Sequence, residues 1–165
     1  MQRIPMRSGL AIASVAIAMT ACAQYAASSS ASASSSAASR SAIAVVHDAG
    51  GRQLGTMSIS ENSSGLSITG ALRGLPPGVH GIHLHAVGMC DGAFASAGGH
   101  WNPTARQHGF DNPQGAHEGD MQNVTVGADS SVMVAVTTRG GTLRGASGLL
   151  DADGAALVVH AGPDD

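Results

Sequence analysis

The feature that most constrains this chain is a set of histidines in its second half. Six of its eight histidines and one aspartate fall at spaced positions: His83, His85, His100, His108, His117, Asp120 and His160. Imidazole suits copper and zinc, and a carboxylate often completes a zinc site. The spacing predicts two adjacent metal ions, so the fold must bring distant segments of the chain together.

The first two of these histidines lie in a segment with the pattern of a β-strand. Residues 79–87 alternate with a period of two, which places His83 and His85 on one face of a strand. Two imidazoles on one face can take neighbouring positions around one metal. We expect His80 to be a hydrogen-bonded structural histidine and His47 to be a surface histidine.

Residues 88–120 lose this periodicity and are rich in glycine and proline. Loops of this length are uncommon in compact domains, and they are usually functional when they occur. Metal binding by the histidines and Asp120 would supply order that side-chain burial cannot. The alternative is a disordered surface loop with incidental histidines.

The rest of the chain after residue 41 predicts an all-β domain. Turn signals separate seven short apolar runs, at 42–48, 54–60, 65–72, 79–87, 121–127, 131–138 and 155–161. We expect one hydrophobic core over 42–165, built mainly from aliphatic side chains.

Several motifs in this region closely resemble those of the copper/zinc superoxide dismutase family. They are GIHLH at 81–85, SAGGHWNP at 96–103, HG at 108–109, HEGD at 117–120 and LVVH at 157–160. The resemblance covers residues 42–165. It implies a Greek-key β-sandwich or flattened barrel, with seven strands and the family's last strand missing.

The resemblance also implies roles for individual residues. The copper ligands would be His83, His85, His100 and His160, and the zinc ligands would be His100, His108, His117 and Asp120. His100 would be the imidazolate shared by both metals. Asp164 would link a copper-site histidine to a zinc-site histidine, and Cys90 would be the loop half of the family's disulfide.

The implied activity is conversion of superoxide to dioxygen and hydrogen peroxide by a redox-cycling copper beside a structural zinc. His100 would be the catalytic residue, because a bridging imidazolate can accept a proton and later return it to the peroxide. The alternative is a non-catalytic copper- and zinc-binding protein, a buffer or chaperone.

In the family, a further loop and strand follow the position of Asp165. They carry the second disulfide cysteine and an arginine that guides the anion, and Arg139 and Arg144 lie on a different stretch. We therefore expect a weakly active or truncated dismutase, and the sequence leaves open whether the short form is natural.

The N-terminus predicts export from the cytoplasm. Residues 1–21 combine a basic start with an apolar run too short to span a bilayer and then Met-Thr-Ala-Cys, which resembles a lipoprotein signal. Cys22 would carry the lipid anchor, and residues 22–41, rich in alanine and serine, would form a flexible tether. Ala23 after the cysteine favours the periplasmic side of the outer membrane. An ordinary secretory signal and a soluble periplasmic protein are the alternative.

Only two cysteines occur, so Cys90 would have no partner in the mature chain under either signal. The chain has no lysine, and its eight arginines face eleven acids, for a net charge of −3. This balance gives no indication of nucleic-acid binding. An acidic surface repels superoxide, so any steering must come from local positive potential, including the metals.

Overall fold

Strands formed by alternating apolar and polar residues build the domain. The structure, a computed structural model, describes residues 40–164. In chain order the strands are β1 (Ser41–His47), β2 (Gln53–Asn62), β3 (Gly65–Arg73), β4 (Gly78–His80), β5 (Ile82–His85), β6 (Val124–Val126), β7 (Ser131–Thr137) and β8 (Ala156–Val159). A short 3₁₀ helix, η1 (Ala95–Ala97), lies between β5 and β6. All-β architecture is thereby confirmed.

The larger sheet has the antiparallel order β1-β2-β3-β7. A two-residue turn joins β2 to β3, because Asn62 pairs with Gly65. The chain then leaves the sheet for β4, β5 and β6 and returns as β7 beside β3, which is a Greek-key connection. The inward side chains of this sheet, such as Met57, Ile68 and Leu72, are fully buried.

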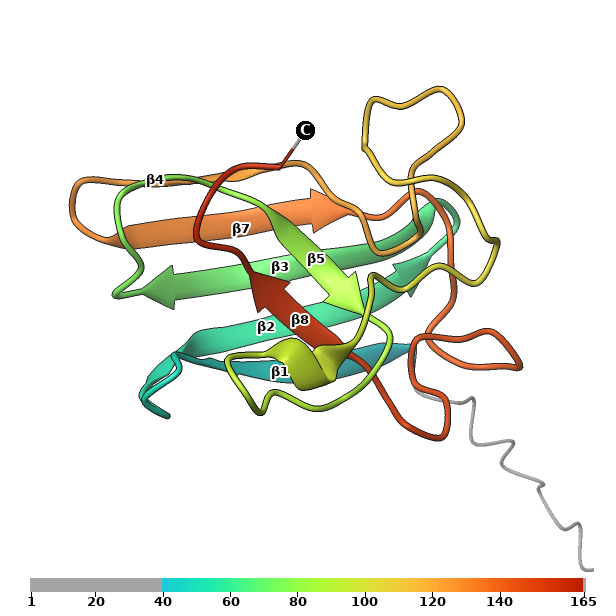
Figure 1. The fold of residues 1–165 in the computed structure, drawn as a ribbon, viewed down its shortest axis with the longest axis horizontal. Helices are drawn as coiled ribbons and strands as arrows, with labels where there is room; N and C mark the ends of the chain where they lie inside the picture. The colour runs from blue at the N-terminus through green and yellow to red at the C-terminus, as the bar shows by residue number, and fades with distance from the viewer. Residues whose placement is uncertain (1–39, 165) are drawn as a thin grey trace, which may run out of the picture. The chain divides into compact units, whose positions relative to one another are not determined.

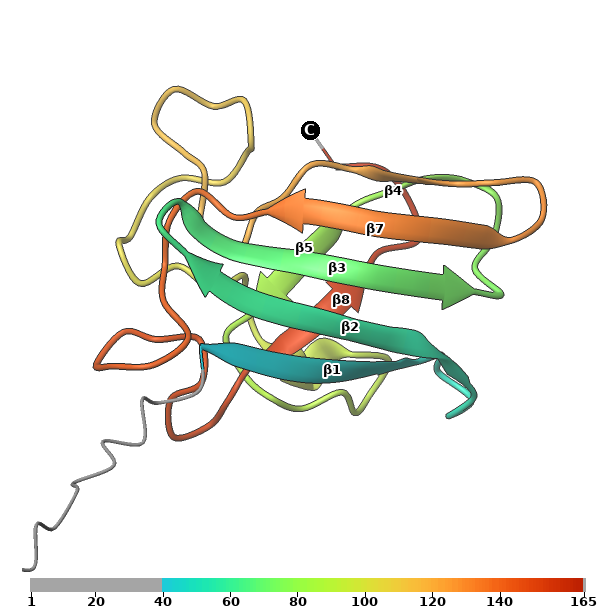
Figure 2. The ribbon, with the colours of Figure 1, turned by 180° about the vertical axis from the view of Figure 1, so that it is seen from behind.

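The second layer consists of two short ladders, β4 with β6 and β5 with β8. Figure 1 shows β5 and β8 crossing in front of the larger sheet, and Figure 2 shows the same sheet from behind. Ile82 and Leu84 of β5 are buried with side chains of the larger sheet in one core cluster. The two layers therefore form a sandwich around that cluster.

Each of the seven predicted segments overlaps a strand, but the expectation of one strand over 79–87 needs correction. The chain breaks at Gly81, between β4 and β5, and the second strand ends at His85. The Gly81 N–H donates to the Gly162 carbonyl and the Gly81 carbonyl accepts from the His160 N–H, each at 2.9 Å. These bonds tie Gly81 to the segment after β8, so the strand exchanges its partner β6 for β8 at this residue. The described residues consequently hold eight strands, where seven were expected.

The loop between β5 and β6 contains η1 as its one regular element in the described part of the chain. Its irregular backbone is held by hydrogen bonds to itself and to β5. The predicted signal (1–21), Cys22 and nearly all of the tether (22–41) lie outside the described residues. Within residues 40–164, no helix has the length and apolar character needed to cross a membrane.

Candidate metal centre

Three backbone hydrogen bonds bring the ligand-bearing segments together. The Leu84 N–H donates to the Gly119 carbonyl at 3.0 Å, and the Gly119 N–H donates to the Trp101 carbonyl at 2.8 Å. The Trp101 N–H donates to the Leu84 carbonyl at 2.8 Å, which closes a triangle. β5 and the segments at 100–101 and 117–120 thus meet through their main chains. Because each segment carries histidines or Asp120, the triangle fixes the backbone positions from which those side chains extend.

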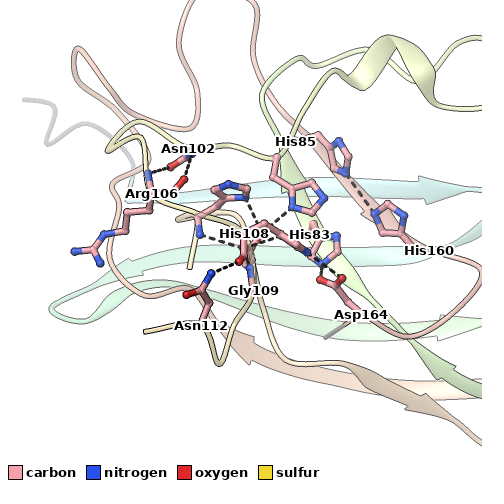
Figure 3. A network of polar contacts seen from close by, with 12 residues as sticks. His83, His85, Asn102, Arg106, His108, Gly109, Asn112, His160 and Asp164 are labelled. Carbon is pink, nitrogen blue, oxygen red and sulfur yellow. Dashed lines mark hydrogen bonds and ion pairs between the residues drawn. The ribbon is translucent and has the colours of Figure 1, made fainter. Parts of the chain in front are cut away.

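The first group of possible metal ligands is made of four histidines. Each of His83, His85, His100 and His160 offers a nitrogen, and these nitrogens all lie within 4.8 Å of one another. His83 and His85 come from β5, and His160 directly follows β8, the strand paired with it. The Nε2 atoms of His85 and His160 are 3.4 Å apart, and a dashed line marks this contact in Figure 3. Pairing of β5 with β8 therefore brings the first two histidines of the predicted ligand set close to the last one.

The second group contains three histidines and one carboxylate. His100, His108, His117 and Asp120 also offer ligand atoms within 4.8 Å of one another. The Nδ1 atoms of the three histidines lie 2.7, 3.1 and 3.3 Å, respectively, from the oxygens of the Asp120 carboxylate. Since His100 belongs to both groups, its ring lies between them.

Asp164 connects the two groups from outside. Its Oδ2 lies 2.6 Å from His83 Nε2, and its Oδ1 lies 3.1 Å from His108 Nε2 (Figure 3). Asn123 holds Asp164 in place: its amide nitrogen donates to the Asp164 carbonyl at 2.7 Å and its oxygen accepts from the Asp164 N–H at 2.9 Å. The carboxylate thus orients one ring of each group.

Two other histidine rings are oriented by backbone carbonyls. His85 Nδ1 lies 2.9 Å from the Gly98 carbonyl oxygen. The buried His80 ring lies 2.7 Å from the His160 carbonyl and 2.8 Å from the Pro76 carbonyl. The expected structural role of His80 is confirmed, and its contact places the backbone of His160. His47 is exposed, as expected.

Unsatisfied buried atoms test whether metals fit here. Within the described residues, the Nδ1 atoms of His83 and His117 are buried and have no hydrogen-bond partner. His117 Nδ1 lies within ion-pair distance of Asp120 but does not reach hydrogen-bond geometry. A buried polar atom without a partner costs about 1–3 kcal/mol, which a bound metal ion would offset. Four nitrogens suit copper, and three nitrogens with one carboxylate suit tetrahedral zinc.

Burial favours the neutral form of three imidazoles in the first group, those of His83, His100 and His160. The pKa of His83 is lowered to about 4, first by burial and then by the neighbouring His100 ring, against the raising effect of Asp164. Burial also lowers the pKa of His100 and of His160. Neutral imidazole is the form that binds metal, so these rings are available as ligands near pH 7.

The two carboxylates of the centre are held in the charged form. Burial alone would raise the pKa of Asp120, but hydrogen bonds from His100 and from the Gly109 and His117 N–H groups outweigh it, and the net pKa is lowered. Burial likewise opposes the lowered pKa of Asp164, and its contacts with the histidines prevail. Asp120 and Asp164 therefore contact their histidine partners as charged carboxylates.

Sequence reasoning missed several residues that support this centre. Asn123 and the Gly98 carbonyl carry no motif, because their roles depend on contacts between distant segments. Glu118, inside the HEGD motif, is buried, and its partner Thr104 was also missed. Cys90 is exposed, has no disulfide partner among residues 40–164 and belongs to neither ligand group.

A Greek-key sandwich that presents two histidine-rich ligand groups sharing one ring defines a class of β-sandwich metalloprotein. Residues 53–165 match the profile of the family described as copper/zinc superoxide dismutase (SODC). This chain belongs to that family. The family uses copper and zinc, and the two histidine groups of this chain could hold them.

Individual relatives agree with this assignment. An extracellular Cu-Zn superoxide dismutase of Brugia pahangi is 36% identical over 124 residues, which are 75% of this chain and 61% of that protein. The chain thus spans less than two thirds of that relative. A SOD-like protein from Bacillus subtilis has a TM-score of 0.70 and 36% identity, covering 74% of this chain and 85% of the other. The Cu/Zn superoxide dismutase from Brucella abortus has a TM-score of 0.63 and 28% identity, covering 76% and 86%.

Proposed function

We propose that this chain is a superoxide dismutase, which converts two superoxide anions and two protons to dioxygen and hydrogen peroxide. The observation that carries the proposal is the pair of four-ligand groups that share His100. Bound copper would supply the one-electron redox chemistry, and bound zinc, which has none of its own, would hold the ligand loop. We assign His83, His85, His100 and His160 to copper and His100, His108, His117 and Asp120 to zinc.

The outer hydrogen bonds set which nitrogen of each ring is free to bind. The Gly98 carbonyl can only accept, so a neutral His85 carries its proton on Nδ1 and offers the Nε2 lone pair. Asp164 is an anion, so His83 carries its proton on Nε2 and offers Nδ1, which is the atom without a partner. These contacts hold the rings in the tautomers that ligation requires.

His100 is suited to hold and release a proton. Its Nδ1 faces Asp120 at 2.7 Å, while the same ring belongs to the first group. We propose that its other nitrogen, Nε2, takes up a proton during the cycle and gives it to the departing peroxide. A cavity of about 620 Å³ gives access, lined by His83, His100, His108, His117, His160 and residues 161–164. This space is ample for a small anion with its water.

The test is to load the full chain with copper and zinc, measure both metals and assay superoxide dismutation. We expect one ion of each metal per chain and activity that His160→Ala abolishes. His47→Ala is the matched control, because His47 is exposed and lies outside both groups. A chain that holds both ions and leaves superoxide unchanged would refute the proposal.

That last outcome would favour the second candidate, a non-catalytic copper- and zinc-binding protein that acts as a buffer or chaperone. One observation supports keeping it: the relative from Bacillus subtilis is described only as SOD-like. The decisive experiment measures two rates in the same preparation. One is the rate at which copper is transferred to a chelator or acceptor protein, and the other is the rate of superoxide dismutation.

We further propose export through the N-terminal signal and anchoring by a lipid on Cys22, which lies outside the described residues. The word extracellular in the name of the Brugia relative supports export, not anchoring. Cys22→Ala should release the protein into the soluble periplasm or block processing. A wild-type protein found wholly in the soluble fraction would refute the anchor.

A further inference from the structure

A buried carboxylate lies inside the HEGD motif but outside both ligand groups. Glu118 has a relative exposure of 5%. Its Oε1 accepts a hydrogen bond from the Thr104 hydroxyl, and its Oε2 has no partner among the described residues. Buried carboxylates are rare and costly unless they are paired. Thr104 therefore provides the one hydrogen bond that the structure gives this side chain.

Thr104 belongs to a turn that is closed by its own hydrogen bonds. The Asn102 side chain donates to the Arg106 carbonyl at 2.9 Å and accepts from the Arg106 N–H at 2.9 Å. Figure 3 shows Asn102 and Arg106 facing each other. Because the turn is closed at both ends, a contact at Thr104 fixes the whole of residues 102–106. This turn directly follows His100 and Trp101.

The Thr104–Glu118 hydrogen bond therefore closes the loop that contains His108. On one side of the loop His100 lies four residues before Thr104, and on the other side His117 and Asp120 flank Glu118. The backbone bond from Gly119 to Trp101 joins the same two segments. A side-chain bond beside that backbone bond restricts how the segments twist against each other.

We propose that Glu118, through Thr104, is a positioning residue for the zinc-binding group His100, His108, His117 and Asp120. The inference rests on the proposed function, because it concerns the zinc that the proposal places there. Within residues 40–164 Glu118 makes no hydrogen bond to a ligand atom; it acts by holding the 102–106 turn against the segment at 117–120. Partners outside the ligand set commonly change metal affinity by about 10–100-fold, and this indirect contact should act at the lower end, about tenfold.

The test compares variants of the full chain by two readouts. Zinc affinity is measured by chelator competition, and cobalt in place of zinc reports ligand geometry through its visible absorption. Thr104→Val removes the donor, and Glu118→Leu removes the acceptor. We expect each to weaken zinc binding about tenfold and to alter the cobalt spectrum, with a smaller effect on copper. Thr104→Ser and Glu118→Gln keep a hydroxyl and a side-chain oxygen, so both should retain the wild-type values.

Three outcomes would overturn the inference. Thr104→Val with wild-type zinc affinity and spectrum, in a protein that binds both ions and dismutates superoxide, would overturn it alone. Equal losses of copper and zinc, with a lowered free energy of unfolding, would show a general loosening of the fold. A wild-type chain that binds no zinc would overturn both this inference and the proposed zinc site.

Discussion

Replacing Gly119 by alanine should disrupt the metal centre without touching a ligand. A Cβ on Gly119 would lie 2.3 Å from the Leu84 carbonyl oxygen, 3.0 Å from the Trp101 nitrogen and 3.1 Å from the Trp101 oxygen. All three are backbone atoms of the triangle that joins the ligand segments, so none can rotate away. Real Cβ atoms essentially never come closer than 3.0 Å to such neighbours. Relieving the closest contact therefore requires a shift of about 0.7 Å.

This shift allows the size of the effect to be worked out. It strains the two hydrogen bonds that Gly119 makes in the triangle, and each is worth about 1 kcal/mol. Together with lost packing, the free energy of unfolding should fall by about 2–4 kcal/mol. Displacement of a reacting group by about 1 Å can cost about a hundredfold in rate. The dismutation rate of the metal-loaded variant should therefore fall by at least about tenfold.

Gly99→Ala is the matched control. Gly99 is exposed, immediately precedes His100, and a Cβ there would meet nothing within 4 Å. Urea unfolding of the metal-free proteins and zinc affinity of the loaded ones should separate the two variants. If Gly119→Ala matches Gly99→Ala in both measurements, the triangle does not position the ligands and the reasoning is wrong.

Three further predictions concern protons, Asp164 and zinc. The pKa of His83 is about 4 in the folded protein against 6.5 unfolded, so the unfolded chain binds the proton first as pH falls. The free energy of unfolding of the metal-free protein should therefore fall by up to about 3 kcal/mol between pH 6.5 and pH 4. Equal urea midpoints at pH 7 and pH 4.5 would contradict this. Asp164→Asn should weaken copper and zinc binding by about tenfold or more in a chelator titration, whereas Asp129→Asn, on an exposed turn, should match the wild type. Zinc at 100 times its dissociation constant should raise the free energy of unfolding by about 2.7 kcal/mol; an unchanged melting temperature would exclude tight binding to the folded state.

Much of the fold could be predicted because strand formation is a local property. A period of two identifies β1, β2, β3 and β7 from their own residues. The same rule puts His83 and His85 on one side of β5, and both enter the first ligand group. The break at Gly81 could not be predicted this way, because it depends on bonds to Gly162 and His160, about 80 positions along the chain.

The supporting residues of the site could not be predicted for the same reason. Asn123 precedes β6 in an ordinary polar context, and only the fold brings it to Asp164. The Gly98 contact to His85 uses a backbone carbonyl, which every residue has. Glu118 looks like a surface residue in the sequence, and it is buried beside Gly119, which the backbone triangle joins to Leu84 and Trp101. The residue types of the ligands can be identified from the sequence, whereas the contacts that orient the ligands form only when the loops pack together.

The charge of the centre explains why neutral histidines serve this chain better than cationic ones. Among the described residues that line the cavity there is no arginine, and Asp164 is its one carboxylate. The whole chain carries a net charge of −3. Protonated imidazoles would attract an anionic substrate but could not bind metals. The lowered pKa values of His83, His100 and His160 instead keep these three rings without positive charge until metal binds. Two divalent cations would then reverse the sign of the local potential while Asp120 and Asp164 stay ionised. In this arrangement attraction of superoxide and the capacity to react with it would arise together, from the same bound ions.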